Sequence, residues 1–481
     1  MVKYEKIIIS LLLTLALLIA VLSILPTIEA KPEELPVIKV GMNAYNIYFA
    51  VEYARERGWD KELGIKLEPV YFVAGLLNLQ SLVAGEVCIS YGLGDAPVYV
   101  AASKEMDFRV IGIHVESGSL NNLVSIPEIK SIPELKGKRV GVMKGSMEEM
   151  FLRMALSKYD IDPDKDVEIV YMESPEVYAA LIAKRIDAGV PHFTHALELK
   201  RIYKYNILMT GTDLPKPPKP ISVMGYNFIA VNRAWAEKNP DLVVKFLALY
   251  YRAMDYYEKD PITLNKYCAE KHNAQHGTNL TDRDINDIFN LLHRYSLEEH
   301  IKVLFNPEQP ENVWNGARGM CEVFVRLGRI NKIPDLKKYI DPSYMKKLYE
   351  YKENATLAIE NAEKAIQKAS EVGGAILPAN TLKEQAKEAL NKYNYWVALD
   401  LAKKAIESAE TAEKTAKASK EELLKEINTV KESIKEANNL VSKAIESAEV
   451  AKNTAIAGIV IAVIAIAIAI FTVITYRKRV R

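Results

Sequence analysis

Four loops of this sequence combine glycine, amide, hydroxyl and imidazole groups in patterns that suit the binding of a small molecule. Each loop follows a short apolar run, and ligands gather where loops leave the carboxyl ends of strands in α/β sheets. Gly145 and Ser146 stand directly before a helical pattern, so their N–H groups and hydroxyl can hold an anion without a positive side chain. Residues 92–97 offer the same chemistry. The candidate ligand-binding residues are Asn43, Tyr45, Asn46, Gly75, Gly94, Asp95, Ala96, Pro97, Gly145, Ser146, His192, Thr194, His195 and Tyr226.

Aromatic residues lie at or near the ends of the same apolar runs. Tyr45, Phe193 and Tyr226 can stack on a planar ring, and an aromatic cleft with few charges suits a planar heterocycle or an aromatic acid. For Tyr48 and Tyr91, packing in the core explains the pattern equally well.

His192 and His195 follow Pro191 in the fourth loop, and three interpretations of this pair stay open. The two imidazoles can contact a ligand, they can bind a metal, or they can be ordinary hydrogen-bonding residues at a helix start. The metal interpretation is the weakest, because no Cys or carboxylate stands beside them at the spacing of a metal site.

The residue types that carry catalysis are not arranged for it. Cys88, Cys268 and Cys321 are far apart and odd in number, which excludes a disulfide framework and a Cys-rich metal site. No Ser-His-Asp order, paired carboxylates or phosphate loop stands out. We therefore expect a binding protein without a cofactor or metal and not an enzyme.

Strand-like and helix-like patterns alternate between residues 37 and 231, which indicates an α/β fold with largely parallel sheets. The alternation restarts near residue 139, and two lobes with a return to the first are the simplest topology. We expect a globular ectodomain at residues 31–347, with lobe 1 at about 37–125 and 223–347 and lobe 2 at about 126–222. The expected strands are 38–42, 65–73, 88–91, 109–114, 139–143, 167–171, 188–190 and 226–231.

Residues 348–453 are rich in Ala, Glu, Lys, Ile and Leu, and they predict an all-α stalk. Apolar residues recur there at steps of three and four, notably over 427–451. Breaks are expected at 373–378 and 393–396, which gives two or three helices, the last from about 419 to 453. Two arrangements stay open: an intramolecular bundle, which the small seam residues favour, and self-association as a coiled coil.

Both ends of the chain carry long apolar runs. Residues 1–30 are typical of an export signal, with basic residues before an apolar run at 7–25 and a small residue at Ala30. An uncleaved anchor stays open, because about 19 apolar residues nearly span a bilayer. Residues 454–476 predict a transmembrane helix, and the basic tail at 477–481 places the C-terminus in the cytoplasm. We therefore expect a single-pass anchor in the cell membrane with an extracellular ectodomain.

The overall charge argues against a polyanionic partner. The 481 residues include 63 Lys and Arg and 62 Asp and Glu, a net charge of +1, and 49% are hydrophobic. A domain that binds nucleic acid usually has a clear basic excess, so we expect no nucleic-acid partner.

Several phrases of the ectodomain, taken in their order and spacing, resemble a known family. They are similar to the substrate-binding proteins of ABC importers for nitrate, sulfonates, taurine and thiamine-precursor pyrimidines. The resemblance covers about two thirds of the chain. The phrases that carry it are Gln80 to Val87, Gly92 to Pro97, Leu135 to Val142 with Gly145-Ser146, Ile186 to Gly189 with Pro191, and Asn239 to Val243.

The resemblance implies a two-lobed α/β ectodomain of the periplasmic-binding-protein type II-like fold, here followed by the helical stalk and one transmembrane helix. Such proteins close on a small solute by hinge bending and dock on a permease with its ATPase. The sequence departs from the family at Cys88, where an Asp is common, and this leaves the solute open. Two rivals are a surface-structural or adhesion protein, and a pyrimidine-precursor synthase on the same fold, whose Cys-rich motif this chain lacks.

Overall fold

The computed structural model of the chain describes residues 34–43, 49–214, 225–450, 458–459 and 461–465. The predicted export signal at 1–30, Tyr45, Asn46 and most of the predicted span at 454–476 lie outside these residues. Among the residues that are described, no helix is both long enough and apolar enough to cross a membrane. The chain divides into two compact units, residues 1–347 and 348–481, and each is described here by itself.

The first unit contains two five-stranded sheets, which confirms the predicted two-sheet α/β fold. The first sheet has the order β2-β1-β3-β10-β4. Strand β1 is parallel to β2 and β3, whereas β10 runs antiparallel to β3 and β4. The bounds of these strands are β1 Val37–Asn43, β2 Lys66–Phe72, β3 Ile89–Gly94, β4 Arg109–Glu116 and β10 Tyr226–Val231.

The helices that accompany the first sheet begin and end at the expected signals. Gly85 follows α4 with φ of +78°, the left-handed conformation that glycine adopts most readily after a helix. Pro240 opens α10, where its missing N–H leaves no helical hydrogen bond unmade. The helices are α2 Ala50–Glu56, α3 Trp59–Glu62, α4 Gly75–Ala84, α5 Asp95–Ser103, α9 Arg233–Lys238, α10 Pro240–Lys259, α11 Pro261–His276, α12 Asp282–Asn290, α13 Leu297–Glu299, α14 Val313–Arg326 and α15 Leu336–Tyr339.

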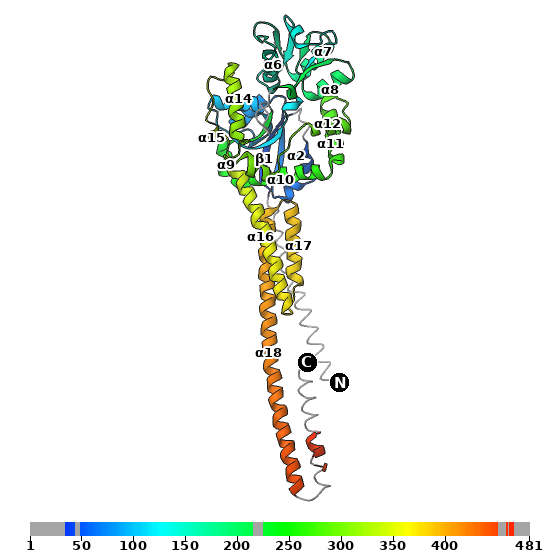
Figure 1. Cartoon of the computed structure of the whole chain (residues 1–481), viewed down its shortest axis with the longest axis vertical. Coiled ribbons are helices and arrows are strands. Elements are labelled where there is room, and N and C mark those ends of the chain that lie inside the picture. Colours follow the sequence, from blue (N-terminus) through cyan, green and yellow to red (C-terminus); the bar gives the residue numbers. More distant parts are fainter. Residues whose placement is uncertain (1–33, 44–48, 215–224, 451–457, 460, 466–481) are drawn as a thin grey trace, which may run out of the picture. The chain divides into compact units, whose positions relative to one another are not determined.

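The second sheet has the order β7-β6-β8-β5-β9, and α6, α7 and α8 accompany it (Figure 1). A core of side chains that includes Val124, Val177, Leu181 and Leu199 joins this sheet to its helices. The bounds are β5 Asn122–Ser125, β6 Arg139–Val142, β7 Glu168–Tyr171, β8 Ala188–Gly189, β9 Asn206–Thr210, α6 Met147–Ser157, α7 Ser174–Ile182 and α8 Phe193–Arg201.

The sequence patterns missed β5, β9 and α8. Strand β5 pairs with β8 and β9 in the second sheet, so the first crossing between lobes lies before Asn122 and not near residue 125 as expected. Two short strands of four and five residues carry too little alternation to be distinguished from loop.

The two chain crossings between the sheets pack tightly on one another through glycines. The N–H of Ser117 donates to the carbonyl of Gly225 at 2.7 Å, and the N–H of Gly211 donates to the carbonyl of Asn121 at 2.9 Å. A Cβ on Gly211 would lie 1.7 Å from the carbonyl oxygen of Gly118, and one on Gly225 would lie 2.1 Å from its nitrogen. These crossings therefore leave no room for a side chain at either position.

The second unit is built on three long helices with breaks where they were expected: α16 Ser343–Glu371, α17 Leu377–Asn391 and α18 Tyr395–Val450 (Figure 1). The last helix begins at Tyr395 and not near residue 419, because the apolar repeat continues through that region without a breaking residue. It has 56 residues, or about 84 Å at 1.5 Å per residue. Buried Ala side chains join the first part of α18 to α16 and α17, as an intramolecular bundle requires.

Candidate functional site

A pocket of about 130 Å³ lies between the two lobes. Its wall comes from the loops at the carboxyl ends of strands in both sheets and from the first turns of α4, α6 and α8. Apolar, amide and hydroxyl side chains dominate the wall. The lining residues are Ala74, Gly75, Leu76, Gly92, Gly94, Pro97, Ser117, Leu120, Asn121, Met143, Lys144, Gly145, Ser146, Met147, Glu148, Pro191, His192, Phe193 and Asn227.

The structure brings together six residues that the sequence singled out as ligand contacts, and their role in binding stays a prediction. Four others, Ala96, Thr194, His195 and Tyr226, are buried and do not line the pocket, and neither does Asp95. Of the first loop, the structure describes Asn43, the last residue of β1. The six lining residues are Gly75, Gly94, Pro97, Gly145, Ser146 and His192.

The Gly145-Ser146 loop does not offer all the free donors that the sequence suggested. The N–H of Gly145 donates to Oε2 of Glu149 at 2.7 Å. The hydroxyl of Ser146 donates to the carbonyl of Met143 at 2.8 Å and accepts the N–H of Glu149 at 3.2 Å, as an N-cap. The sequence prediction is wrong on this point because the first turn of α6 brings the carboxylate of Glu149 back to the loop, where it competes with a bound anion for the N–H of Gly145.

The charged side chains of the pocket wall were missed from the sequence. Lys144 is exposed, and its ammonium lies 5.2 Å from the centre of the Tyr171 ring. Glu148 faces the same pocket, and burial raises the pKa of its carboxyl above the usual range. Lys144 is the one basic residue between Met143 and Ser146. Its place in a predicted ligand loop could have identified it as a candidate contact for an anion. The pocket wall therefore holds one cation and one acid whose charged form is disfavoured by burial.

Glu149 is the centre of a buried polar cluster behind the loop. Its side chain is 1% exposed, and its Oε1 accepts from Nε of Arg153 at 3.1 Å and from the hydroxyl of Tyr171 at 2.8 Å. Arg153 also donates to Asp164 at 3.0 Å. The guanidinium of Arg329, which follows α14 in the first lobe, also contacts Oε1 of Glu149. The ligand loop, α6 and the first lobe are therefore joined through one carboxylate.

Asp95, the first residue of α5, is buried in the first lobe close to the second chain crossing. Its Oδ2 accepts the N–H of Gly225 at 3.3 Å. Its Oδ1 and the hydroxyls of Tyr99 and Tyr226 are buried without a hydrogen-bond partner among the described residues. Burial raises the pKa of Asp95 to about 7, although the backbone N–H groups of Gly225 and Ala96 oppose the rise. Burial also raises the pKa of Tyr99, and the charge of Asp95 adds to this rise.

We expect Asp95→Asn to stabilise the protein at pH 8 and to have little effect at pH 4. The pKa of Asp95 is near 3.8 when unfolded and about 7 when folded, so wild-type stability falls as the pH rises between these values. The amide stays neutral and can still accept the N–H of Gly225. The gain at pH 8 is on the order of 4 kcal/mol at most. Thermal unfolding of both proteins at the two pH values measures it, and an equal difference at both would contradict a buried, protonated Asp95.

The two histidines of the fourth loop differ in their surroundings. The backbone N–H of His192 donates to the hydroxyl of Ser174 at 2.7 Å, and its Nδ1 lies 3.1 Å from Oγ1 of Thr194. His195 is 4% exposed and stacks on Tyr178 at 4.7 Å. Burial lowers the pKa of His192 to about 3 and that of His195 to about 4. Among the described residues no three His, Cys, Asp or Glu side chains could hold a metal.

The remaining aromatic candidates also separate into two groups. Phe193 lines the pocket, so a ring is available there for stacking. Tyr91 is 1% exposed and packs on His114 at 4.4 Å and on Tyr250 at 6.0 Å, which confirms its core interpretation. The structure also brings amide and hydroxyl groups of the crossings into the wall, through Ser117 and Asn227. No local sequence pattern predicted these two residues as part of the site, because they are about 110 positions apart and come together only in the fold.

Comparisons with known proteins agree with this geometry. A family model described as NMT1/THI5 like matches residues 46–263. A protein described as a binding protein in Brucella abortus strain 2308 is 27% identical over 301 residues, 60% of this chain and 85% of that protein. The taurine-binding periplasmic protein of Escherichia coli strain K12 is 27% identical over 204 residues, 42% of this chain and 60% of that protein.

The fold is also found among solved structures. The periplasmic aliphatic sulphonate binding protein of Escherichia coli has a TM-score of 0.50 and 19% identity, with 64% of this chain and 92% of that chain covered. These relatives are named as binding proteins and none of the three as an enzyme. Residues 46–263 match the NMT1/THI5 like family, and the resemblance of this chain to periplasmic binding proteins for sulfonates and taurine is confirmed.

Proposed function

We propose that this protein is the solute-binding receptor of an ABC importer, and that it captures a small solute between its lobes and delivers it to a permease. The observation that carries the proposal is the pocket itself. Its wall is shared between the two sheets, with Gly94 and Pro97 on one side and Gly145 and Ser146 on the other. A solute in this position contacts both lobes and so favours the closed arrangement.

The proposed solute is a small anion, or a planar heterocycle, of the sulfonate, taurine, nitrate or pyrimidine kind. The pocket of about 130 Å³ is smaller than the roughly 300–1,000 Å³ of pockets for drug-sized ligands. Lys144 supplies one positive charge, and the ring of Phe193 supplies a stacking surface. The relatives that are named for taurine and aliphatic sulphonate support the anionic choice.

The proposed location is the outer face of the cell membrane. The sequence patterns of an export signal at 1–30 and of a membrane span at 454–476 support it. A receptor anchored beside its permease works at a high local concentration without a closed periplasm. The competing proposal, a surface-structural or adhesion protein, gives the helical region the main role and predicts no solute in the pocket.

Two single-residue changes should move the affinity for an anion in opposite directions. Lys144→Met should lower the affinity for taurine or an alkanesulfonate about tenfold, because it removes the cation of the pocket wall. Glu148→Gln should raise the affinity, because it removes an acid from the pocket wall. Thermal shift of the full-length protein against sulfonates, nitrate, pyrimidines and aromatic acids measures both effects.

The matched control for Lys144→Met is Lys138→Met, since Lys138 is exposed in the same lobe and lies outside the pocket wall. Equal affinities of the two variants would argue for an uncharged planar solute. If no solute of these classes raises the melting temperature of the wild-type protein, the receptor proposal loses to the structural one.

A further inference from the structure

The last helix, α18, carries large apolar side chains along a stretch where no other described helix packs on it. The turn between α16 and α17 lies against Ala412, because a Cβ on Gly374 would be 3.0 Å from the carbonyl oxygen of that residue. Before this point the seam residues of α18 are small and buried, as Ala402 and Ala409 show. Beyond it, Leu423 is 49% exposed and Ile434 is 49% exposed. Large apolar residues therefore join the seam of α18 beyond the turn between α16 and α17, where none of the described helices packs on it.

The apolar residues of this stretch include a strict heptad repeat in the sequence. From Leu423 to Ala448 the steps alternate between four and three, a period of 3.5 residues that keeps one seam facing a partner helix in a left-handed coiled coil. A helix that is solvated on all sides has no such requirement. In this register the a positions are Ile427, Ile434, Val441 and Ala448, and the d positions are Leu423, Val430, Ala437 and Ala444.

We propose that residues 423–448 pair with the same segment of a second copy of this chain, as a parallel and in-register two-stranded coiled coil. The residue types at the a positions favour two strands, because Ile427, Ile434 and Val441 are β-branched. The Ala residues at the later d positions let the two helices approach closely. This interaction does not depend on the solute proposed above, and it adds self-association to the intramolecular bundle formed by the first part of α18.

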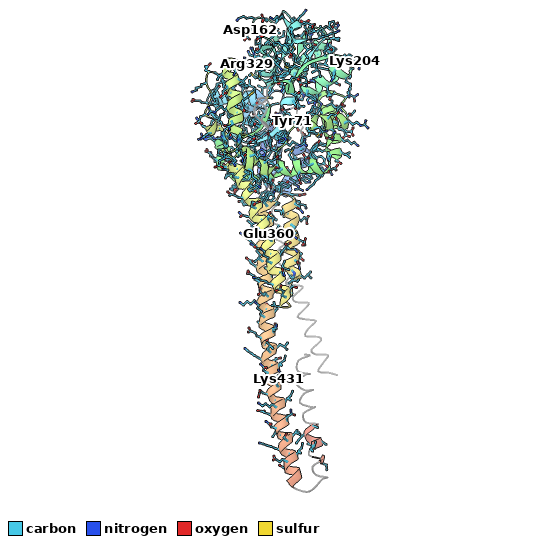
Figure 2. The ribbon with its side chains drawn as sticks, viewed as in Figure 1. Tyr71, Asp162, Lys204, Arg329, Glu360 and Lys431 are labelled. Carbon is cyan, nitrogen blue, oxygen red and sulfur yellow. The ribbon has the colours of Figure 1, made fainter. Side chains whose placement is uncertain are left out.

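The flanking positions specify the parallel register. In such a coiled coil each g residue lies beside the e residue five positions later in the partner helix. Glu426 then meets Lys431 of the other copy, an acid with a base, and Leu440 meets Ile445, two apolar residues. Figure 2 shows the side chain of Lys431 standing out from α18, and Leu440 is 64% exposed while Ile445 is 41% exposed. In the parallel arrangement, opposite charges therefore lie side by side and apolar surface meets apolar surface.

Cysteine cross-linking of the full-length protein in mild detergent tests the pairing. Ile434→Cys places a thiol at an a position, where it meets its counterpart, so oxidation should convert most of the protein to a covalent homodimer. Glu432→Cys is the matched control, since position 432 is an f position on the opposite face and should yield at least tenfold less dimer. The wild-type chain supplies the background, because Cys268 and Cys321 are buried and Cys88 is partly exposed.

Charge reversal then tests the register. On the Ile434→Cys background, Glu426→Lys or Lys431→Glu should each slow cross-linking several-fold, and the double exchange should restore the rate. Equal cross-linking at 432 and 434 would overturn the proposal. So would a monomeric or trimeric mass in sedimentation, or a seam that another segment of the same chain or a different protein occupies.

Discussion

Gly211→Ala and Gly225→Ala should each destabilise the first unit by roughly 3 kcal/mol or more. A Cβ at position 211 would lie 1.7 Å from the carbonyl oxygen of Gly118, and one at 225 would lie 2.1 Å from its nitrogen and 2.5 Å from its Cα. These neighbours are backbone atoms and cannot rotate away. Gly225 also has φ of +117°, a conformation that an alanine rarely adopts.

Relief of these contacts requires the two chain crossings to separate. Their separation breaks the hydrogen bond from the N–H of Ser117 to Gly225 and loosens the one from Gly211 to Asn121. Because Ser117 and Asn121 also line the pocket, the affinity for the solute should fall together with the stability. Urea unfolding and the thermal shift with a bound sulfonate measure the two effects separately.

Gly319→Ala is the control for these glycine changes. Gly319 lies inside α14 with nothing within 4 Å of its ideal Cβ, so alanine should be neutral or stabilise by up to about 1 kcal/mol. The steric account of the crossings fails if Gly225→Ala unfolds at the same urea concentration as Gly319→Ala.

The elements of the first unit could be predicted where a local signal marked both ends. Strand β1 is a short apolar run in which Ile38, Val40 and Met42 are buried, and Gly85 follows α4 in the left-handed conformation. The order of such elements identified the two-sheet fold. The close packing of the two chain crossings could not be predicted from the sequence. Gly118 and Gly225 are more than a hundred residues apart, and nothing local distinguishes either from an ordinary turn glycine.

The candidate site could be predicted as a set of loops but not as a set of contacts. Gly94, Gly145 and Ser146 were selected because they follow predicted strands, and the structure places all three in one pocket wall. Whether the N–H and hydroxyl groups of these loops are available to a ligand depends on their hydrogen bonds to side chains and backbone groups three or four residues away. Glu149, which no sequence pattern singled out, accepts the N–H of Gly145, while Lys144 lines the pocket.

Glu149→Ala should lower the free energy of unfolding by about 3–5 kcal/mol, the usual result of removing one partner from a buried ion pair. The side chain of Arg153 is 6% exposed and would retain Asp164, which is itself 69% exposed, and the neutral hydroxyl of Tyr171. The hydroxyl of Tyr171 and the N–H of Gly145 would also lose their acceptor. The loop at 143–146 should therefore loosen, and the affinity for the solute should fall with it.

Glu149→Gln and Glu148→Gln form a matched pair that separates charge from shape. Gln at 149 keeps most of the volume but removes the negative charge that Arg153 and Arg329 contact, so it should cost about 1–3 kcal/mol. Gln at 148 should cost less than Gln at 149, because burial disfavours the charged form of Glu148 and raises its pKa. Urea unfolding compares the two variants directly. Equal midpoints would mean that the cluster around Glu149 contributes no more to stability than any other acid in the first turn of α6.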